Sequence, residues 1–208
     1  HDASDILKMI QTLLTEKFTM GEQVEKFEKM FAEYMGSKHA ILVNSGSSAN
    51  LLAVAAVSNY KYSNKLNPGD EVLVPSVCWS TSVFPIIQCN LKPVFVDIDP
   101  TTLNVDLKDL EKKITTKTKA IMAVHVLGNC CNIDQLIELT KRYNLLLIED
   151  TCESLGSSYK GKFLGTFGSL GTFSFYYSHH LVTGEGGAIL TDDDQLYELV
   201  KCLRAHGW

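Results

Sequence analysis

A run of small polar residues, Asn44-Ser45-Gly46-Ser47-Ser48, lies between the apolar stretch HAILV and the helical stretch NLLAVAAVSN. Where a helix begins after a strand, free backbone N–H groups and the positive end of the helix can hold a phosphate. Gly46 and Ser47 have small side chains, so an anion can come close to the backbone there. The alternative is a serine that only caps a buried helix, and the segment by itself fits both interpretations.

Asp150 is the last residue of the apolar run LLLIED. A carboxylate at that place is costly unless it is exposed at the tip of the strand or paired with a partner. A protonated pyridine nitrogen is one such partner, because an aspartate beside it keeps the ring cationic and electron-withdrawing. The alternative is an aspartate that caps the following turn.

Two further residues have an ambiguous pattern. Trp79 follows Pro75 and a turn, and its flat face can stack on an aromatic ring, although a large aromatic residue after a strand is more often part of the core. His125, within VHVLG, is open to the same two interpretations. Neither residue decides the function.

The elements that must position these residues begin with two helices. Ile6, Ile10, Leu13 and Leu14 have helical spacing, and a second helix with Val24, Phe27, Phe31 and Tyr34 on one face precedes Gly36. Short apolar runs then alternate with helical stretches: HAILVNS, EVLVPS, KPVFVDI, AIMAVHVLG, LLLIED, GTFSFY and GAILTD. This pattern predicts an α/β fold with a mostly parallel sheet covered by helices on both sides. Ligands of such sheets gather at the C-terminal ends of strands, where the candidate residues lie.

The composition argues against several classes of partner. The net charge of −5 comes from 24 acidic and 19 basic residues spread along the chain, so there is no basic stripe for nucleic acid or an anionic membrane. No apolar run is long enough to cross a bilayer and the N-terminus lacks a signal-peptide pattern, which predicts a cytoplasmic protein. The six cysteines lack the spacing of a zinc site, and we expect them to be mostly buried thiols: Cys78, Cys89, Cys130, Cys131, Cys152 and Cys202.

The segment 168–188, GSLGTFSFYYSHHLVTGEGGA, is far more specific. It resembles the sugar aminotransferase family typified by DegT, DnrJ, EryC1 and StrS, whose pattern is G-x-x-G-x-F-S-F, then a lysine, then T-x-G-E-G-G. Other motifs follow the family's order: FTMGEQVEKFE, VNSGSSAN, PGDEVLVPS, PVFVDIDP, VHVLG, IEDTCESLGS and RAHGW. Their number and order, over essentially the whole chain, argue against coincidence.

The resemblance implies the type I fold of pyridoxal-phosphate enzymes, which is like that of aspartate aminotransferase, and a homodimer with active sites at the subunit interface. Residues 1–208 would form the cofactor-binding large domain, made of the N-terminal helices and the α/β core, with the smaller C-terminal domain outside this chain. The implied cofactor is pyridoxal 5′-phosphate or pyridoxamine 5′-phosphate, and no metal is expected. The family's cofactor contacts fall on phosphate-binding Gly46, Ser47 and Ser174, on Trp79 stacked over the ring, on Asp150 at the ring nitrogen and on Glu153 near the ring substituents.

One departure from the family pattern concerns the reaction. The lysine lies five positions after the serine of F-S-F, here Ser174, and four before the position of Thr183, which directly precedes GEGG; both counts reach His179. An imidazole cannot form a Schiff base with the cofactor, but it can move protons near neutral pH. The sugar 3-dehydratase branch of the family has a histidine pair at this place, as His179-His180 does here.

This branch implies a lyase that removes the C3 hydroxyl of a nucleotide-linked 4-keto-6-deoxy sugar, in deoxysugar biosynthesis, with His179 as the base. We favour the GDP-sugar type, which takes its amine from glutamate, over the CDP-sugar type with an iron–sulfur cluster, because Cys152 alone does not make a cluster. Two alternatives stay open: an aminotransferase of a nucleotide-linked 4-keto sugar, and a non-catalytic module that keeps a cofactor pocket.

Overall fold

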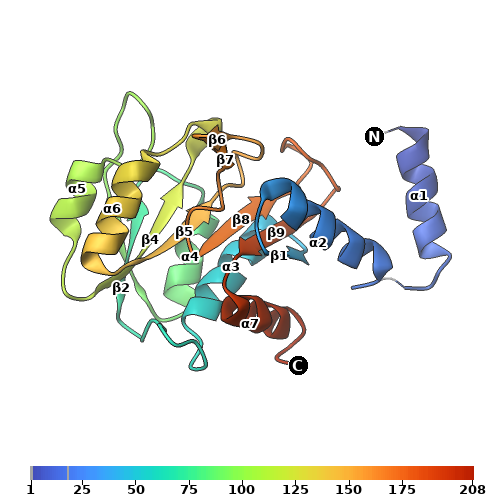
Figure 1. Ribbon diagram of the computed structural model, residues 1–208, viewed down its shortest axis with the longest axis horizontal. Coiled ribbons are helices and arrows are strands. Elements are labelled where there is room, and N and C mark those ends of the chain that lie inside the picture. Colours follow the sequence, from blue (N-terminus) through green and yellow to red (C-terminus); the bar gives the residue numbers. More distant parts are fainter. Residues whose placement is uncertain (1, 18) are drawn as a thin grey trace.

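The computed structural model describes residues 2–17 and 19–208; His1 and Phe18, the first residue of the FTMGEQVEKFE motif, lie outside the described residues. Within that part of the chain one seven-stranded sheet has the order β1-β9-β8-β5-β4-β2-β3 (Figure 1). Its strands are β1 (His39–Val43), β2 (Glu71–Pro75), β3 (Lys92–Val96), β4 (Thr118–Val124), β5 (Leu146–Asp150), β8 (Leu170–Ser174) and β9 (Gly187–Thr191).

The sheet is mostly parallel, as the sequence predicts. Strand β9 is antiparallel to both of its neighbours, β1 and β8, and the other neighbouring pairs are parallel. A short hairpin of β6 (Ser158–Tyr159) and β7 (Lys162–Phe163), which the sequence pattern does not predict, lies outside the sheet. All seven apolar runs of the sequence therefore become strands of one sheet.

Helices cover both faces of this sheet (Figure 1). The core on one face contains residues of α3 (Gly46–Val57), α4 (Ser80–Gln88) and α7 (Asp194–Arg204). The other face is covered by α5 (Leu107–Lys113) and α6 (Ile133–Tyr143), and beside them by α2 (Glu22–Met35). A short 3-10 turn, Val126–Gly128, follows β4.

The alternation of side chains along β5 assigns its residues to the two faces. Ile148 packs in the core of the α3 face, whereas Leu147 packs in the core of the α5 and α6 face. Because successive side chains of a strand point to opposite faces, Asp150 belongs to the α3 face and Glu149 to the other. Two neighbouring carboxylates are thereby placed on opposite sides of the sheet.

Helix α2 packs on the sheet through aromatic rings, but one residue of its predicted buried face is exposed. Phe31 meets Phe173 edge to face with ring centroids 5.3 Å apart, and Phe175 at 5.6 Å. Tyr34, which we expected on the same face, is 63% exposed, although the ring of Phe163 on β7 stacks on it. The helix ends at Gly36, whose φ of 71° is easily adopted only by a residue without a side chain.

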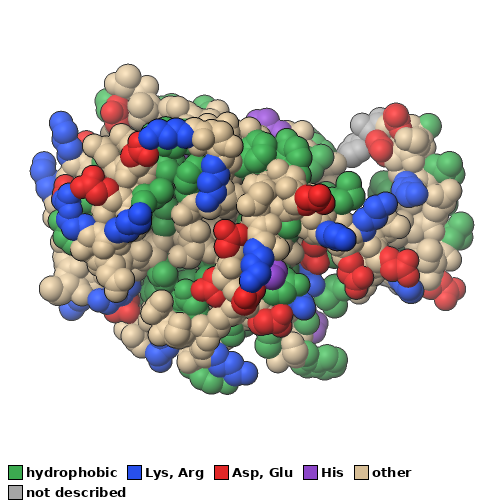
Figure 2. Space-filling model, viewed as in Figure 1, with side chains coloured by type: hydrophobic (Ala, Val, Ile, Leu, Met, Phe, Trp, Pro, Cys, Tyr) green, Lys and Arg blue, Asp and Glu red, His purple; other side chains and the backbone are tan. Residues whose placement is uncertain are grey.

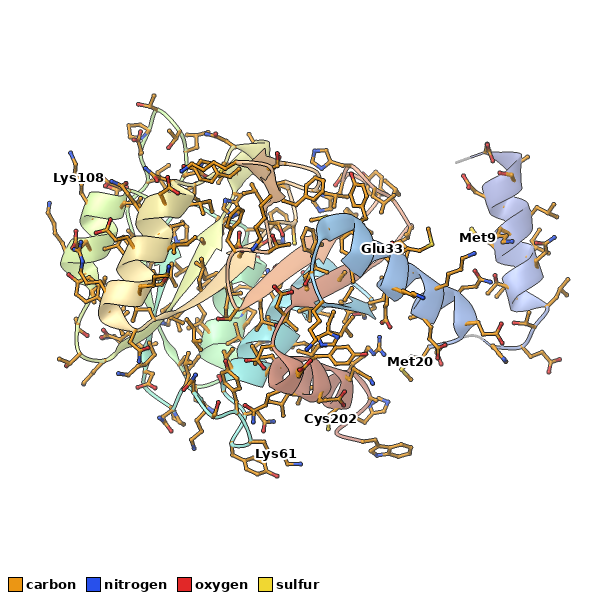
Figure 3. The ribbon with its side chains drawn as sticks, viewed as in Figure 1. Met9, Met20, Glu33, Lys61, Lys108 and Cys202 are labelled. Atoms are coloured by element: carbon orange, nitrogen blue, oxygen red, sulfur yellow. The ribbon has the colours of Figure 1, made fainter. Side chains whose placement is uncertain are left out.

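Helix α1 (Ala3–Leu13) forms as predicted, with Leu14 as its C-cap, but none of its residues is buried. Figure 1 shows it apart from the α/β body, and Met9 in Figure 3 has no element beside it. In the part of the chain that is described, no helix is long and apolar enough to cross a membrane. On the face seen in Figure 2, acidic and basic side chains are interspersed.

The expectation of buried thiols was largely wrong. All six cysteines are free thiols, but only Cys131 is buried, and the other five are partly buried. Sequence spacing excludes a zinc site or a disulfide framework, but it does not report how deeply each side chain lies.

Candidate active site

The start of helix α3 touches the end of strand β8. Ser45 is the N-cap, and its hydroxyl accepts a hydrogen bond from the Ser48 N–H at 3.1 Å, so the capping interpretation is correct for this serine. A Cβ atom at Gly46 would lie 2.6 Å from Ser174 Cβ and 2.8 Å from Cys152 Sγ. Only glycine fits there. The unpaired N–H groups of the first helical turn are therefore held directly beside the Ser174 hydroxyl.

Ser47 joins this region to helix α4. Its hydroxyl lies 3.1 Å from the Thr81 hydroxyl, in the first turn of that helix. Trp79 is the N-cap residue of α4 and is 71% exposed, so it is not the ordinary core residue that its place after a strand suggests. Two helix N-termini thus begin side by side at one edge of the sheet.

Asp150 is buried rather than exposed at the strand tip, with 4% of its surface accessible. Its Oδ2 accepts hydrogen bonds from Asn50 Nδ2 at 2.8 Å and from the Ser82 hydroxyl at 2.7 Å. Its Oδ1 accepts one from the Cys152 N–H at 3.2 Å, which is the turn-capping role proposed as the alternative. Among the described residues its hydrogen-bond partners are neutral donors, which stabilise the carboxylate and leave Oδ1 with room for another donor.

Sequence reasoning missed the residues that hold Asp150. Asn50 lies inside the apolar helix α3, and its Oδ1 accepts a 2.6 Å hydrogen bond from the Thr172 hydroxyl on β8. Asn50, Ser82 and Thr172 are all buried. A polar residue within an apolar stretch, as Asn50 is within NLLAVAAV, is the signal that could have found them.

Glu149, the neighbour of Asp150, binds a different segment on the other face. Its Oε1 accepts hydrogen bonds from the N–H groups of Phe167 and Gly168, both at 2.7 Å, and its Oε2 accepts one from Gly165 at 3.0 Å. The Nε2 of His125 lies 3.1 Å from the same Oε2. This fully buried carboxylate therefore fixes the loop that leads into β8.

His125 belongs to this buried network. Its Nδ1 accepts a hydrogen bond from the Cys131 N–H at 3.1 Å, so Nε2 is the nitrogen that donates to Glu149. His125 has no accessible surface. It is therefore a core residue, which is one of the two interpretations given above.

The remaining predicted residues, Glu153 and His179, lie on loops. Glu153 accepts a hydrogen bond from the Leu127 N–H at 3.0 Å. His179 follows β8 in the loop to β9, where its N–H donates to the Tyr176 carbonyl at 2.9 Å. Its ring lies edge to face with the Tyr176 ring, at 6.4 Å between centroids. Within residues 2–17 and 19–208, no hydrogen bond reaches a ring nitrogen of His179 and no contact joins it to Asp150.

Burial and the nearby charge of Asp150 raise the pKa of Cys152 well above its ordinary value. The same two causes raise the pKa of Cys78. Both thiols therefore stay neutral near pH 7, so Cys152 brings no negative charge to the first turn of α3.

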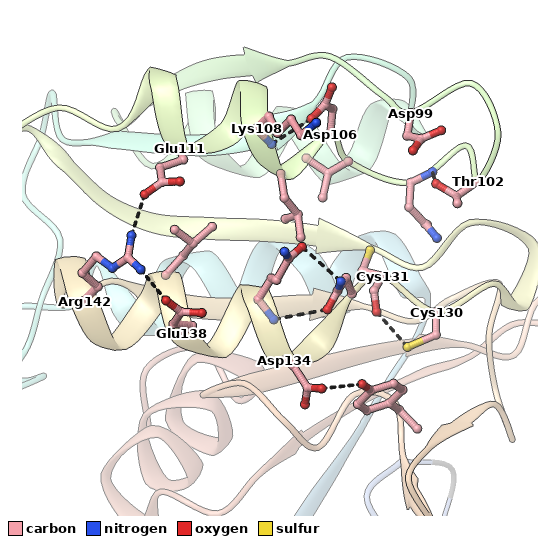
Figure 4. A pocket seen from close by; sticks show the side chains of 17 residues that line it. Asp99, Thr102, Asp106, Lys108, Glu111, Cys130, Cys131, Asp134, Glu138 and Arg142 are labelled. Atoms are coloured by element: carbon pink, nitrogen blue, oxygen red, sulfur yellow. Dashed lines mark hydrogen bonds and ion pairs between the residues drawn. The ribbon is translucent and has the colours of Figure 1, made fainter.

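A hollow between α5 and α6 lies apart from these residues (Figure 4). In its lining, Arg142 pairs with Glu111 at 2.7 Å and also with Glu138. None of the predicted site residues lines it. Gly46, Trp79 and Asp150 lie instead where α3 and α4 begin and where β5 ends.

Residues 1–208 match the model of the DegT/DnrJ/EryC1/StrS aminotransferase family. The chain belongs to this family. It is 50% identical over 203 residues to the GDP-4-keto-6-deoxy-D-mannose 3-dehydratase of Yersinia pseudotuberculosis, covering 97% of this chain and 51% of the relative. It is 44% identical to the GDP-perosamine synthase of Caulobacter vibrioides, covering 91% of this chain and 49% of the relative.

Solved structures of the DegT/DnrJ/EryC1/StrS family have the same fold. A GDP-4-keto-6-deoxymannose-3-dehydratase with a trapped PLP-glutamate geminal diamine is 47% identical, with a TM-score of 0.92 over 97% of this chain and 52% of the other. The predicted aminotransferase-type α/β fold is thereby confirmed. The chain spans about half the length of the curated relatives it matches.

Proposed function

We propose that the protein is a dehydratase that removes the C3 hydroxyl of GDP-4-keto-6-deoxymannose with the help of pyridoxamine 5′-phosphate. The observation that carries the proposal is His179, which stands where the family pattern has its lysine. The 50% identity to a relative named as a dehydratase of this sugar supports it.

The residues beside α3 suit a phosphorylated pyridine cofactor. Gly46 leaves a space beside Ser174 that a single methyl group would fill, and the first turn of α3 offers N–H groups to a phosphate. Asp150 is a buried carboxylate with acceptor capacity left on Oδ1, as a protonated ring nitrogen requires. The neutral Cys152 thiol beside Gly46 does not repel an anion.

Each residue then has a separate task. Gly46, Ser47 and Ser174 would bind the phosphate, Asp150 the ring nitrogen, and Trp79 the face of the ring, with Glu153 near the ring substituents. When bound, the cofactor supplies an amine that joins the 4-keto carbon of the sugar and a ring that withdraws electrons. A glutamate would restore the amine after each turnover, in line with the PLP-glutamate adduct named for the solved relative.

His179 would move the protons. Its ring nitrogens make no hydrogen bond within the described chain, so the imidazole is free to take a proton from the cofactor carbon that bears the amine. The same imidazole would deliver a proton to the C3 hydroxyl, which leaves as water. An imidazole is suited to both steps near neutral pH.

An aminotransferase acting on a 4-keto sugar is the second candidate. The 44% identity to a GDP-perosamine synthase favours it, and His179 argues against it. Borohydride reduction of the cofactor-loaded protein distinguishes the two. We expect no pyridoxyl-lysine by mass spectrometry, whereas one on any lysine would favour the aminotransferase.

Turnover with GDP-4-keto-6-deoxymannose, pyridoxamine phosphate and glutamate tests the proposal, with the CDP-linked sugar as a comparison. The adjacent histidines provide a matched pair of variants. We expect His179→Asn to lower the rate by about 10²-fold or more, the usual range for a lost general base, and His180→Asn to keep it. Turnover that survives in His179→Asn but not in His180→Asn would assign the base to His180. A folded protein with neither cofactor nor turnover would instead indicate a non-catalytic module.

Three further parts of the proposal concern the setting of the enzyme. We infer a homodimer and a cytoplasmic location, with neither nucleic acid nor a membrane as partner. The interspersed surface charge is in keeping with this setting. Sedimentation of the protein at several concentrations tests the dimer.

A further inference from the structure

Asn50 is a buried amide whose two ends have different partners. It is 1% exposed on α3, with Nδ2 at 2.8 Å from Asp150 Oδ2 and Oδ1 at 2.6 Å from the Thr172 hydroxyl. A carboxylate only accepts hydrogen bonds, so the amide must turn its NH₂ group toward Asp150. The Thr172 hydroxyl then donates to the other end, and the orientation of the amide is fixed.

The two oxygens of Asp150 are consequently unequal. Oδ2 receives two donors, from Asn50 and from Ser82, which together occupy both of its lone pairs. Oδ1 accepts from the Cys152 N–H at 3.2 Å, and the Cys152 thiol is a further, weak donor to the carboxylate. Neutral donors stabilise an ionised carboxylate in a buried place without introducing a competing positive charge.

We propose that Asn50 is a positioning residue that keeps Asp150 ionised and leaves its Oδ1 available to a protonated pyridine nitrogen, an inference that rests on the proposed function. Asn50 does not touch the cofactor in this role. It acts through Asp150, and Thr172 acts through Asn50. Three elements, α3, α4 and β8, thereby contribute to one property of the aspartate.

The variant Asn50→Asp tests this role because it keeps the size of the side chain and replaces the donor by an acceptor. Two carboxylates would then face each other across a 2.8 Å contact, and a proton must lie between them. Asn104→Asp is the matched control. Asn104 is also buried, and its Nδ2 donates to the Asn129 carbonyl at 3.2 Å while its Oδ1 accepts from the Val126 N–H at 3.1 Å. Neither of these hydrogen bonds involves Asp150.

The measurement uses pyridoxamine 5′-phosphate labelled with ¹⁵N in the ring, whose chemical shift reports protonation of that nitrogen between pH 6 and 9. We expect a protonated ring in the wild type and in Asn104→Asp. In Asn50→Asp we expect the ring nitrogen to lose its proton within this range and the affinity to fall about tenfold or more, as for loss of a hydrogen bond to a charged group. Thr172→Val keeps the shape of the side chain and should weaken binding of the cofactor about fivefold, with the same loss of ring protonation. This variant replaces Asn50→Asp in the test if Asn50→Asp does not fold.

Binding of labelled cofactor within twofold of wild type in Asn50→Asp or Thr172→Val, with a protonated ring, would overturn the inference. An equal loss in Asn104→Asp would also overturn it, because the effect would then be one of general stability. The proposed function fails separately: a wild-type protein that binds the cofactor with a protonated ring but does not dehydrate the sugar refutes the dehydratase alone. A wild-type protein that does not bind pyridoxamine phosphate refutes both.

Discussion

Replacing Glu149 by glutamine should destabilise the fold strongly although the two side chains have the same shape. Glu149 is fully buried, and its oxygens accept from Gly165, Phe167 and Gly168 and from the His125 ring. An amide has one oxygen, so its NH₂ group must face either the two N–H groups at Oε1 or the two donors at Oε2. In both orientations two buried donors lose their acceptor.

The size of the effect follows from that count. A buried donor without a partner costs about 1–3 kcal/mol, so two should lower the free energy of unfolding by about 2–6 kcal/mol. His125 cannot easily compensate by exchanging its tautomer, because its Nδ1 must stay an acceptor for the Cys131 N–H. Urea unfolding at pH 7, followed by circular dichroism, measures the difference.

Glu153→Gln is the control for this measurement. Glu153 is partly exposed and accepts from the Leu127 N–H through one oxygen, which an amide can still provide. We expect a loss of less than about 1 kcal/mol for this variant. If Glu149→Gln also lost less than about 1 kcal/mol, the four hydrogen bonds at Glu149 would not be what stabilises the loop before β8.

The other predictions concern the cofactor site and the pH dependence of stability. Gly46→Ala should weaken pyridoxamine phosphate binding about tenfold and cost about 1–3 kcal/mol of stability, because its Cβ would overlap Ser174; fluorescence titration and urea unfolding measure the two effects, and unchanged affinity would place the phosphate elsewhere. His179→Lys should permit covalent attachment of the cofactor to the introduced lysine, trapped by borohydride and seen by mass spectrometry, with loss of dehydration. Retention of full dehydration would contradict the role of His179. Hydrogen bonds from Thr115 and Lys92 lower the pKa of Glu71. Its contribution to stability is therefore complete above the unfolded value of about 4.3 and lost as the pH falls through the lower folded value. Glu71→Gln should reduce the free energy of unfolding at pH 7. The variant should also lose less of this free energy than the wild type does between pH 7 and pH 3, as measured by urea unfolding at both pH values. An equal loss in the two proteins would show that Glu71 is not linked to acid unfolding.

The sequence predicted the strands well because their apolar runs are short, continuous and separated by helices. The periodicity also gave helices α1 and α2, but it placed Tyr34 on the buried face, since spacing alone does not reveal that β7 covers only one side of that residue. The periodicity could not predict which strands are neighbours in the sheet. The position of β9 between β1 and β8 depends on contacts between segments far apart in the chain.

For the site, motif spacing indicated Gly46, Asp150 and Ser174, and the structure brings the first and last into contact. The partners of Asp150 were missed because Asn50, Ser82 and Thr172 come from three distant segments and only folding makes them neighbours. The roles of Gly46, Asp150 and Ser174 toward the cofactor remain predictions, as do those of Ser47, Trp79, Glu153 and His179.

The contact between Gly46 and Ser174 has a consequence for the order of events in folding. This contact requires β8 to lie between β5 and β9, and His39 of β1 pairs with Thr191 of β9. During synthesis, strand β1 and the first turn of α3 can therefore gain these neighbours only after the residues of β8 and β9 have been made. Such long-range pairing is slow, and exposed strand edges meanwhile favour aggregation. Acquisition of the cofactor should accordingly be a late step, and a cofactor present during refolding should act on the last stage of assembly and not on the first.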